Sequence, residues 1–464
     1  MLFSSMIFLW RFVPIVFIGY FLVQDKYKNI LLLLASLLFY AWGEPRYIWL
    51  MIGSIFVNYG IGLLMDKYVS KKRLLLILDI TVNIGILGYF KYFNFLLEIV
   101  NGCTGKKIEF TEVRLPIGIS FFTFQILSYI IDLYRGQYKA QKNLLHLALY
   151  ISFFPQLIAG PIVQYKDINE QLSHRVCTLE KTAWGIRRFI YGLGKKVIIA
   201  NIIAQCVDTI YALDYSDLTG TLAWIGAILY TMQIYYDFSG YSDMAIGLGR
   251  IFGFDFRENF KYPYLSCSIQ EFWQRWHISL GTWFKEYVYI PLGGNRRGRG
   301  KTYLNLLIVF FATGLWHGAG FNFILWGLYH GLFQIIERLG IGKFLAGHKM
   351  IARIYTLTVC IFGWVLFRAD DLTQAGVMIR RMLMPWEYVE SSLIMGKIFG
   401  NKTIAVIFAG ILGCGFMQFF LNKTTISEKI KNSYMEMAYC SLVFVLCIAA
   451  LASGTYNPFI YFRF

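Results

Sequence analysis

Two histidines in an apolar stretch are the side chains best suited to chemistry in this sequence. His277 stands in EFWQRWHISLGTW and His317 in GLWHGAG. A neutral imidazole can take a proton from an attacking hydroxyl, which is general base catalysis. No GxSxG motif is present and no convincing Ser-His-Asp set accompanies the histidines. Any catalysis in this chain therefore rests on histidine.

The segment before His317 places this histidine deep in an apolar environment. Residues 303–315 form an apolar stretch of 13 residues, about 20 Å of helix against a hydrocarbon core of about 30 Å. A histidine at that depth is costly unless it is paired or lines a wet cavity, so we predict a functional role. A hydrogen bond that links two helices is the alternative. Gly314, Gly318 and Gly320 would let the backbones approach closely.

Indole side chains surround His277. Trp273, Trp276 and Trp283 accompany it in the sequence, and such residues favour membrane interfaces. One interpretation is an interfacial aromatic belt in which the histidine bonds to backbone. The functional interpretation is a second polar group in the same cavity as His317.

A third histidine, His330, lies 13 residues beyond His317. On a straight helix this separation exceeds three turns, so the two rings would not share one reacting atom. We predict that His330 has a structural role.

A basic loop precedes residues 303–315. The segment GGNRRGRGK, residues 293–301, contains Arg296, Arg297, Arg299 and Lys301. It lacks the GxxxxGK[ST] pattern of a P-loop. A phosphate-bearing donor such as coenzyme A would suit this loop, and anionic lipid would suit it equally.

Two further motifs contain polar groups beside apolar segments. DFSGYSD, residues 237–243, follows an apolar stretch, and we predict helix capping by Ser239 or Ser242, with acid/base chemistry as the alternative. The tail NPFIYFRF, residues 457–464, carries the hydroxyl of Tyr461. Interfacial anchoring is the simplest function of such an aromatic tail.

The composition indicates an all-α polytopic membrane protein. Of 464 residues, 57% are hydrophobic and 15% are charged, and the mean hydropathy is +0.53. The net charge of +17 fits cytoplasmic loops that contact membrane lipids, so we predict no nucleic-acid partner. The eight cysteines include no CxxC pair, and we predict neither a metal site nor a tightly bound cofactor.

The apolar runs predict about 11 to 13 membrane segments, some of them re-entrant. Two long polar loops, 164–188 and 254–292, carry aromatic residues between charges and predict interfacial helices. The candidate spans are 2–23, 30–42, 48–65, 74–93, 117–134, 144–163, 185–204, 222–237, 303–315, 321–336, 354–366, 404–420 and 439–453.

Basic clusters predict the orientation of these segments. They lie within residues 26–28, 67–73, 296–301 and 423–431. All four can be cytoplasmic if the N-terminus is outside. This arrangement requires that at least one candidate between the second and third clusters does not cross.

Five ordered stretches resemble the membrane-bound O-acyltransferase (MBOAT) family. They are LPIGISFFTFQILSYIIDLYRG, FFPQLIAGPIVQY, YYDFSGYSDMAIGLGRIFGFDFRENF, EFWQRWHISLGTWFKEYVYIPLGGNRRG and GLWHGAGFNFILWGLYHG, which together span the core motif region 115–331. The sequence is most similar to the bacterial AlgI-like alginate and polysaccharide O-acetyltransferases, with DltB and PatA as relatives. The resemblance implies one domain over residues 1–464, a ring of helices around a central tunnel, and a place in the bacterial plasma membrane.

The resemblance also implies the site and the partners. His317 would be the essential histidine and His277 the second motif histidine. The donor would be cytosolic acetyl-CoA, and an extracytoplasmic SGNH-type acetyltransferase would pass the acetyl group to a polysaccharide. A companion peptide of the DltB relatives ends in a tyrosine-bearing motif, and the tail 457–464 is similar to it, which makes Tyr461 a possible acyl relay.

We therefore expect His317 to act as general base on a hydroxyl, either that of Tyr461 or the partner's serine. His277 would orient the thioester or stabilise the oxyanion. The expected substrate- and donor-binding residues are Trp316, Trp276, Arg296, Arg297 and Arg299. Two alternatives remain: a DltB-like transfer from an acyl carrier protein, and a transporter that moves an acylated precursor without bond chemistry.

Overall fold

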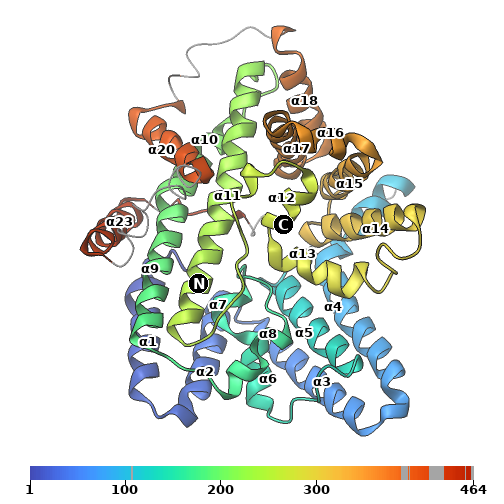
Figure 1. Ribbon diagram of the computed structural model, residues 1–464, viewed down its shortest axis with the longest axis vertical. Helices are drawn as coiled ribbons and strands as arrows, with labels where there is room; N and C mark the ends of the chain where they lie inside the picture. Colours follow the sequence, from blue (N-terminus) through green and yellow to red (C-terminus); the bar gives the residue numbers. More distant parts are fainter. Residues whose placement is uncertain (106–107, 388–395, 397, 417–432, 455, 461–464) are drawn as a thin grey trace. The chain divides into compact units, whose positions relative to one another are not determined.

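Helices joined by turns and loops make up the part of the protein that the structure describes. A computed structural model describes residues 1–105, 108–387, 396, 398–416, 433–454 and 456–460 (Figure 1). These residues contain no strand, which confirms the predicted all-α fold. Five helical stretches among them are long and apolar enough to cross a membrane, namely Ile48–Lys67, Val69–Thr104, Leu179–Tyr211, Lys349–Arg368 and Tyr434–Ser453.

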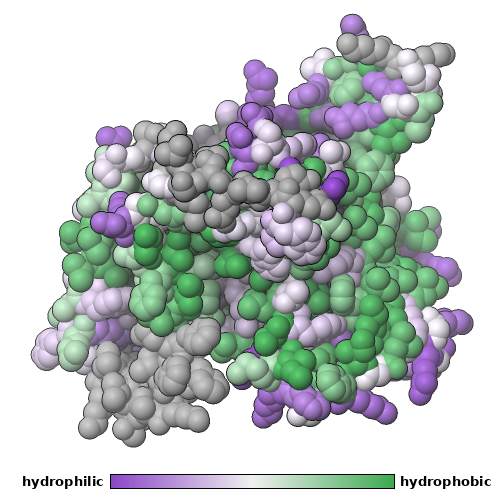
Figure 2. Space-filling view, turned by 90° about the horizontal axis from the view of Figure 1, so that it is seen from above, coloured by the Kyte–Doolittle hydropathy of each residue, from purple (hydrophilic) through white to green (hydrophobic). Residues whose placement is uncertain are grey.

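Hydrophobic side chains cover much of the exposed surface. Figure 2 shows wide hydrophobic areas between hydrophilic patches on the face that it presents. Among the exposed apolar residues are Leu22 and Trp49, whose side chains are 79% and 73% accessible. Soluble monomers rarely expose apolar areas this large, so we expect lipid to cover this surface.

The chain divides into two compact units. The first contains Met1–Phe189 and Met244–Arg257, and the second contains Ile190–Asp243 and Glu258–Phe464. The single domain expected over residues 1–464 stays a prediction. Helices α9 and α11 contribute residues to both units.

In the first unit, α2 packs against α6, and α4 packs against α3 and α5. The helices of this unit are α1 (Val13–Leu22, preceded by a π-helical segment, Phe8–Phe12), α2 (Asp25–Gly43), α3 (Ile48–Lys67), α4 (Lys72–Thr104, preceded by a 3₁₀ turn, Val69–Lys71), α5 (Ile119–Tyr134), α6 (Leu144–Ser152), α7 (Phe154–Leu157), α8 (Tyr165–Ser173) and most of α9 (Leu179–Gly194).

The predicted span 144–163 is wrong as a single helix. The structure breaks it at Phe153 into α6 and α7, of nine and four residues. The break arises because Pro155 lies in the first turn of α7, where its missing N–H costs nothing. Nine residues rise only about 14 Å, so neither helix crosses the hydrocarbon core. This segment is a candidate for the non-crossing segment that the orientation requires.

In the second unit, α15 packs against α14 and α17, and α12 packs against α15 and α17 (Figure 1). The helices of this unit are a π-helical segment (Lys195–Ala200), α10 (Asn201–Tyr211), most of α11 (Gly220–Ile251), a 3₁₀ turn (Pro263–Leu265), α12 (Ile269–Arg275), α13 (Ile278–Phe284), a π-helical segment (Lys285–Tyr289), α14 (Arg299–His317), α15 (Phe321–Ile336), a π-helical segment (Glu337–Ile341), α16 (Gly342–Gly347), α17 (Lys349–Arg368), α18 (Leu372–Leu383), a 3₁₀ turn (Pro385–Glu387), α20 (Asn401–Ile411), a π-helical segment (Leu412–Phe416) and α23 (Tyr434–Ser453).

Two helices are longer than their apolar segments indicate. Helix α2 contains 19 residues where the sequence predicts the 13 of 30–42. Helix α14 also contains 19 residues, because it begins at Arg299 inside the basic loop. The apolar pattern misses these first turns since their side chains are polar and solvated.

Helix α11 overturns the predicted capping by Ser239 or Ser242. Both serines lie inside this helix of 32 residues, and so do Asp237 and Asp243. All four side chains are buried. Capping requires a helix end, so DFSGYSD must have another use.

Candidate active site

His317 is the last residue of α14, where it meets α15 in a close helical hairpin. A Cβ placed at Gly314 would lie 2.4 Å from the backbone oxygen of Phe323, and one at Gly327 would lie 2.2 Å from that of Phe310. No side chain fits in such gaps, so only glycine allows this approach. The hairpin fixes the end of α14 and with it the backbone of His317.

Aromatic rings enclose the His317 imidazole. Its ring centroid lies 4.9 Å from that of Trp316, 5.0 Å from Trp326 and 5.1 Å from Phe367, and the residue is 6% exposed. Trp326 comes from α15 and Phe367 from α17. The depth of this histidine in the bilayer stays a prediction.

His277 lies between α12 and α13, in a backbone conformation that few residues adopt. Its φ is +44°, and the only other positive φ of a non-glycine residue in the described chain is at Tyr262. Such a conformation persists only where the surroundings impose it. Helix α12 leads into it and is capped by Ser268, whose hydroxyl accepts from the N–H of Glu271 at 2.9 Å.

Asn259 holds His277 in place. Its side-chain oxygen accepts from the backbone N–H of Ser279 at 3.1 Å and from the Ser279 hydroxyl at 2.9 Å. His277 Nδ1 lies 3.2 Å from the same oxygen, and the Asn259 carbonyl accepts from the N–H of Ile278 at 3.0 Å. Because the Ser279 N–H is always a donor, the atom facing it is the amide oxygen, and this oxygen favours a hydrogen on His277 Nδ1.

This tautomer leaves Nε2 of His277 as the basic nitrogen. Nε2 has no hydrogen-bond partner within the described chain. Burial lowers the pKa of His277 from 6.5 to about 3, so the imidazole is neutral near pH 7. The site therefore contains an unprotonated nitrogen that is free to accept a hydrogen bond.

The two histidines, 40 positions apart in the sequence, lie together in the structure. Their ring centroids are 6.5 Å apart, and the His277 ring also contacts Phe238 at 4.6 Å and Trp316 at 5.9 Å. A cavity of about 10 Å³ lies beside them, which is room for about one water. Its lining is His317, Trp276, Ile234, Phe238, Trp364, Phe367 and Ile460. His277 is not part of that lining.

The C-terminal tail reaches this cavity through Ile460, which is 5% exposed. The ring of Phe459 stacks on Tyr241 with centroids 4.8 Å apart. The described part of the tail, 456–460, is therefore packed against protein at its end, in contrast to an interfacial anchor. Tyr461, the residue after Ile460, lies outside the described residues.

A buried ion pair holds the tail. Lys196 Nζ lies 2.6 Å from Asp237 Oδ1, and both side chains are 3% exposed. Asp237 Oδ2 accepts from the backbone N–H of Ile460 at 2.8 Å, and Lys196 donates to the carbonyl of Pro458. This is the use of the first carboxylate in DFSGYSD: it fixes the chain end beside the cavity.

The second carboxylate of that motif makes a parallel pair. Asp243 Oδ2 lies 2.6 Å from Lys195 Nζ. The two lysines are consecutive and begin a π-helical segment, where the wider turn changes which faces successive side chains present. Sequence reasoning did not single out these lysines. Their signal was two adjacent cations inside an apolar span, which in a membrane protein calls for partners.

The indoles near His277 are core residues. Trp276 is 2% exposed and Trp283 is 5% exposed, so an interfacial belt is wrong for them. Trp276 lines the cavity together with His317. The ring of Trp316 contacts the rings of both His277 and His317. Their expected role in binding substrate stays a prediction.

His330 lies on α15 and contacts aromatic rings of α12 and α15. Its ring centroid lies 5.3 Å from Trp326 and 5.2 Å from Trp273, and the residue is fully buried. Trp326 therefore touches both His330 and His317. A Cβ placed at Gly363 of α17 would lie 2.7 Å from His330 Nε2. These close contacts agree with the structural role predicted for His330, which remains untested.

The basic loop lies at the other end of α14 from His317. Arg296, Arg297 and Arg299 are exposed, and none pairs with a carboxylate in the described part of the chain. A helix of 19 residues separates them from His317 by about 27 Å. Any donor held by this loop must reach along the length of α14 to meet the histidine.

Comparison with known proteins identifies the family. The profile described as MBOAT, membrane-bound O-acyltransferase family, matches residues 78–367. A probable alginate O-acetylase AlgI of Pseudomonas putida is 42% identical over 488 residues, which covers 100% of both chains. A peptidoglycan O-acetyltransferase of Helicobacter pylori is 39% identical over 427 residues, covering 82% of this chain and 80% of its own. A teichoic acid D-alanyltransferase of Bacillus subtilis is 30% identical over 271 residues, covering 54% and 68%. The chain therefore belongs to the membrane-bound O-acyltransferase family and is an enzyme of that class.

Proposed function

We propose that this enzyme transfers an acetyl group from a cytosolic thioester, acetyl-CoA, toward hydroxyls of an extracytoplasmic polysaccharide, in the bacterial plasma membrane. The names of the alginate and peptidoglycan O-acetyltransferases support the acetyl group and the glycan acceptor. Membership of an acyltransferase family leaves the transporter alternative without support.

The observation that carries the proposal is the meeting of His317 and the chain end at one cavity. His317 acts as general base: it takes the proton of the attacking hydroxyl as the oxygen bonds to the thioester carbonyl. The C–S bond then breaks, and the proton passes from His317 to the thiolate. Such base catalysis is typically worth about 10²–10⁴-fold. Aromatic rings enclose the imidazole that acts as this base.

His277 orients the donor. With a hydrogen on Nδ1, its Nε2 is an acceptor. It therefore suits an amide N–H on the donor's arm, and while neutral it cannot donate to an oxyanion. Of the two roles expected from the sequence, orientation of the thioester is the better supported.

The attacking hydroxyl is that of Tyr461, which follows the anchored Ile460 directly. Acetyl-tyrosine then passes its acetyl group to an extracytoplasmic SGNH-type partner. Direct attack by the partner's serine is the alternative. Tyr461→Phe separates the two: loss of transfer with a folded protein supports the relay, and unchanged transfer removes the relay alone.

A carrier protein is the second candidate donor. The exposed arginines at 296, 297 and 299 would suit an acidic protein surface as well as the phosphates of coenzyme A. The similarity to a teichoic acid D-alanyltransferase adds weight to this candidate. Binding measured separately with acetyl-CoA and with acetylated carrier protein distinguishes the two donors.

Release of thiol tests the proposed reaction. The purified full chain, given its extracytoplasmic partner and acetyl-CoA, should release free coenzyme A in step with acetylation of the acceptor. His348→Ala, at an exposed histidine, is the control for substitution itself. If neither acetyl-CoA nor acetylated carrier is cleaved while an acylated precursor crosses the membrane, the proposed function is wrong.

A further inference from the structure

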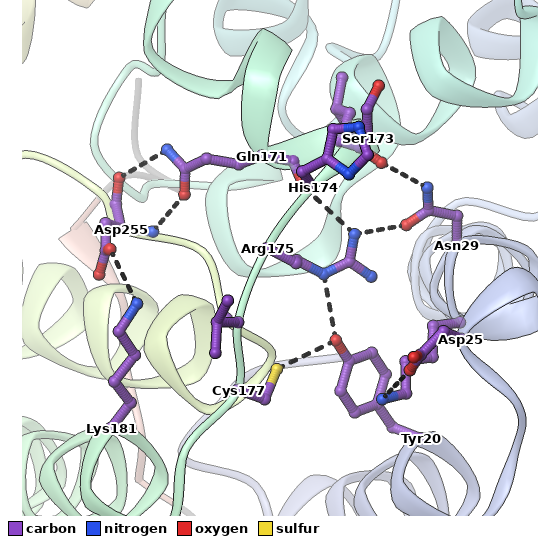
Figure 3. A pocket seen from close by; sticks show the side chains of 14 residues that line it. Tyr20, Asp25, Asn29, Gln171, Ser173, His174, Arg175, Cys177, Lys181 and Asp255 are labelled. Atoms are coloured by element: carbon purple, nitrogen blue, oxygen red, sulfur yellow. Dashed lines mark hydrogen bonds and ion pairs between the residues drawn. The ribbon is translucent and has the colours of Figure 1, made fainter.

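A polar cavity of about 700 Å³ lies within the first unit, and none of the residues of the active site above lines it. Figure 3 shows its lining from close by. Three segments contribute: the turn from α1 to α2, the stretch from α8 into α9, and residues 253–255 after α11. The acetyl-transfer chemistry derived so far does not use its lining residues, so the polar lining needs another explanation.

Arg175 is the central cation of this cavity. Its Nε donates to the Tyr20 hydroxyl at 3.1 Å (Figure 3) and also to the Phe252 carbonyl at 3.0 Å. Its Nη1 donates to Asn29 Oδ1 at 2.7 Å and to the Gln171 carbonyl at 3.3 Å. The guanidinium is thereby fixed in one orientation by neutral acceptors, and Nη2 makes no hydrogen bond within the described chain.

The charges around Arg175 do not balance. Lys28 lies 2.7 Å from Asp25, and Lys181 lies 3.5 Å from Asp255. Arg250 also pairs with Asp255. Asp25 and Asp255 therefore pair with three cations other than Arg175, namely Lys28, Lys181 and Arg250. No carboxylate of the described chain lies within ion-pair distance of Arg175. A half-buried guanidinium without a counter-charge is costly, and a bound anion would offset that cost.

Exposed apolar side chains and a basic cluster lie around this cavity. Leu22 and Leu179, which lie close in sequence to lining residues, are 79% and 87% exposed, and Val176 in the lining is 67% exposed. Lys26 and Lys28 belong to the first of the basic clusters that predict the cytoplasmic side. Apolar side chains beside a fixed cation suit a molecule with a charged head and an apolar tail.

We propose that this cavity binds a phosphate ester, supplied by the headgroup of an anionic phospholipid. Arg175 Nη2 donates to a phosphate oxygen, and Lys28 and Lys181 face the same anion from the rim. A guanidinium held in a fixed plane is well suited to phosphate oxygens. The acyl chains follow the exposed apolar residues. The same phosphate chemistry is present in coenzyme A, so the test must separate a lipid from a soluble ligand.

Retention of bound lipid during purification tests the proposed phosphate site. The full chain is purified in neutral detergent, offered phosphatidylglycerol or phosphatidylcholine, and examined for retained lipid by native mass spectrometry. The intact protein should prefer phosphatidylglycerol, and Arg175→Gln should weaken that binding about tenfold or more, as expected when a hydrogen bond between charged groups is lost. Arg380→Gln, at an exposed arginine of α18, is the matched control and should retain the lipid.

A second variant tests the site without changing Arg175. Arg175 also ties α1 and α2 to the segment after α8, so Arg175→Gln can fail to fold. Lys28→Gln with Lys181→Gln leaves those bonds intact and should weaken phosphatidylglycerol binding several-fold. Coenzyme A is titrated in parallel: if it displaces the lipid through Arg175, the phosphate ester is supported and the lipid source is wrong. Equal retention of both lipids by every variant would overturn the site.

Discussion

The ion pair between Lys196 and Asp237 is predicted to hold the chain end, and one double variant separates this role from simple stability. Asp237→Asn alone leaves a buried ammonium without its counter-charge, which typically costs about 3–5 kcal/mol of stability. Lys196→Met with Asp237→Leu removes both charges, and replacing a buried pair with apolar side chains is often neutral or stabilising. The double variant should therefore fold nearly as well as the intact protein.

The tail, however, should be released in that double variant. The Ile460 N–H and the Pro458 carbonyl each lose a bond to a charged group. Such bonds are worth about 1.5–3 kcal/mol each, so the tail's occupancy of the site should fall at least about 100-fold. If the tail delivers the nucleophile, acetyl transfer should fall accordingly while thermal unfolding stays near the intact protein's midpoint.

The matched control uses the neighbouring pair on the same two helical segments. Lys195→Met with Asp243→Leu also removes a lysine and an aspartate that pair with each other, while the bonds of Asp237 to Ile460 and of Lys196 to Pro458 stay in place. Its transfer rate should stay near that of the intact protein. A folded Lys196→Met/Asp237→Leu protein that transfers acetyl at the normal rate would show that tail anchoring has no part in catalysis.

Three further predictions follow from the same geometry. Gly314→Ala should lower stability by about 1–3 kcal/mol, because the added Cβ has no room. Gly376→Ala is the control, since a Cβ there meets nothing within 4 Å. Thermal unfolding compares the two variants, and equal midpoints would contradict the close hairpin. Asn259→Ala should remove the partner that orients the His277 ring and lower kcat about tenfold or more while the protein stays folded. An unchanged kcat would show that the tautomer of His277 does not matter for the reaction. Arg297→Ala should raise the KM for the donor with little effect on kcat, in a salt-dependent manner; a fall in kcat alone would argue against donor binding at the loop.

Much of the fold could be predicted from the sequence because apolar runs report on membrane helices directly. The all-α class and the family are confirmed. The helix ends were missed where polar turns extend a helix, as at Arg299 in α14. The break between α6 and α7 was missed because an apolar run continues through Pro155, although that proline is itself a visible signal.

The site was predicted in part. One interpretation of the sequence places His277 in the same cavity as His317. Their ring centroids are 6.5 Å apart, but His277 does not line that cavity. Asn259 and Lys196 could not be predicted, because each acts through a partner distant in the sequence. Periodicity reports which face of a helix is buried, and it carries no information on which buried polar groups meet.

The rate of thioester cleavage by His317→Ala tests the central claim most directly. The comparison uses single-turnover release of coenzyme A thiol from acetyl-CoA by the folded variant, the intact protein and the exposed-site control His348→Ala. General base catalysis by His317 predicts a rate about 10²–10⁴-fold lower for His317→Ala, with the control unchanged. A folded His317→Ala protein that cleaves the thioester at the intact protein's rate would contradict the account.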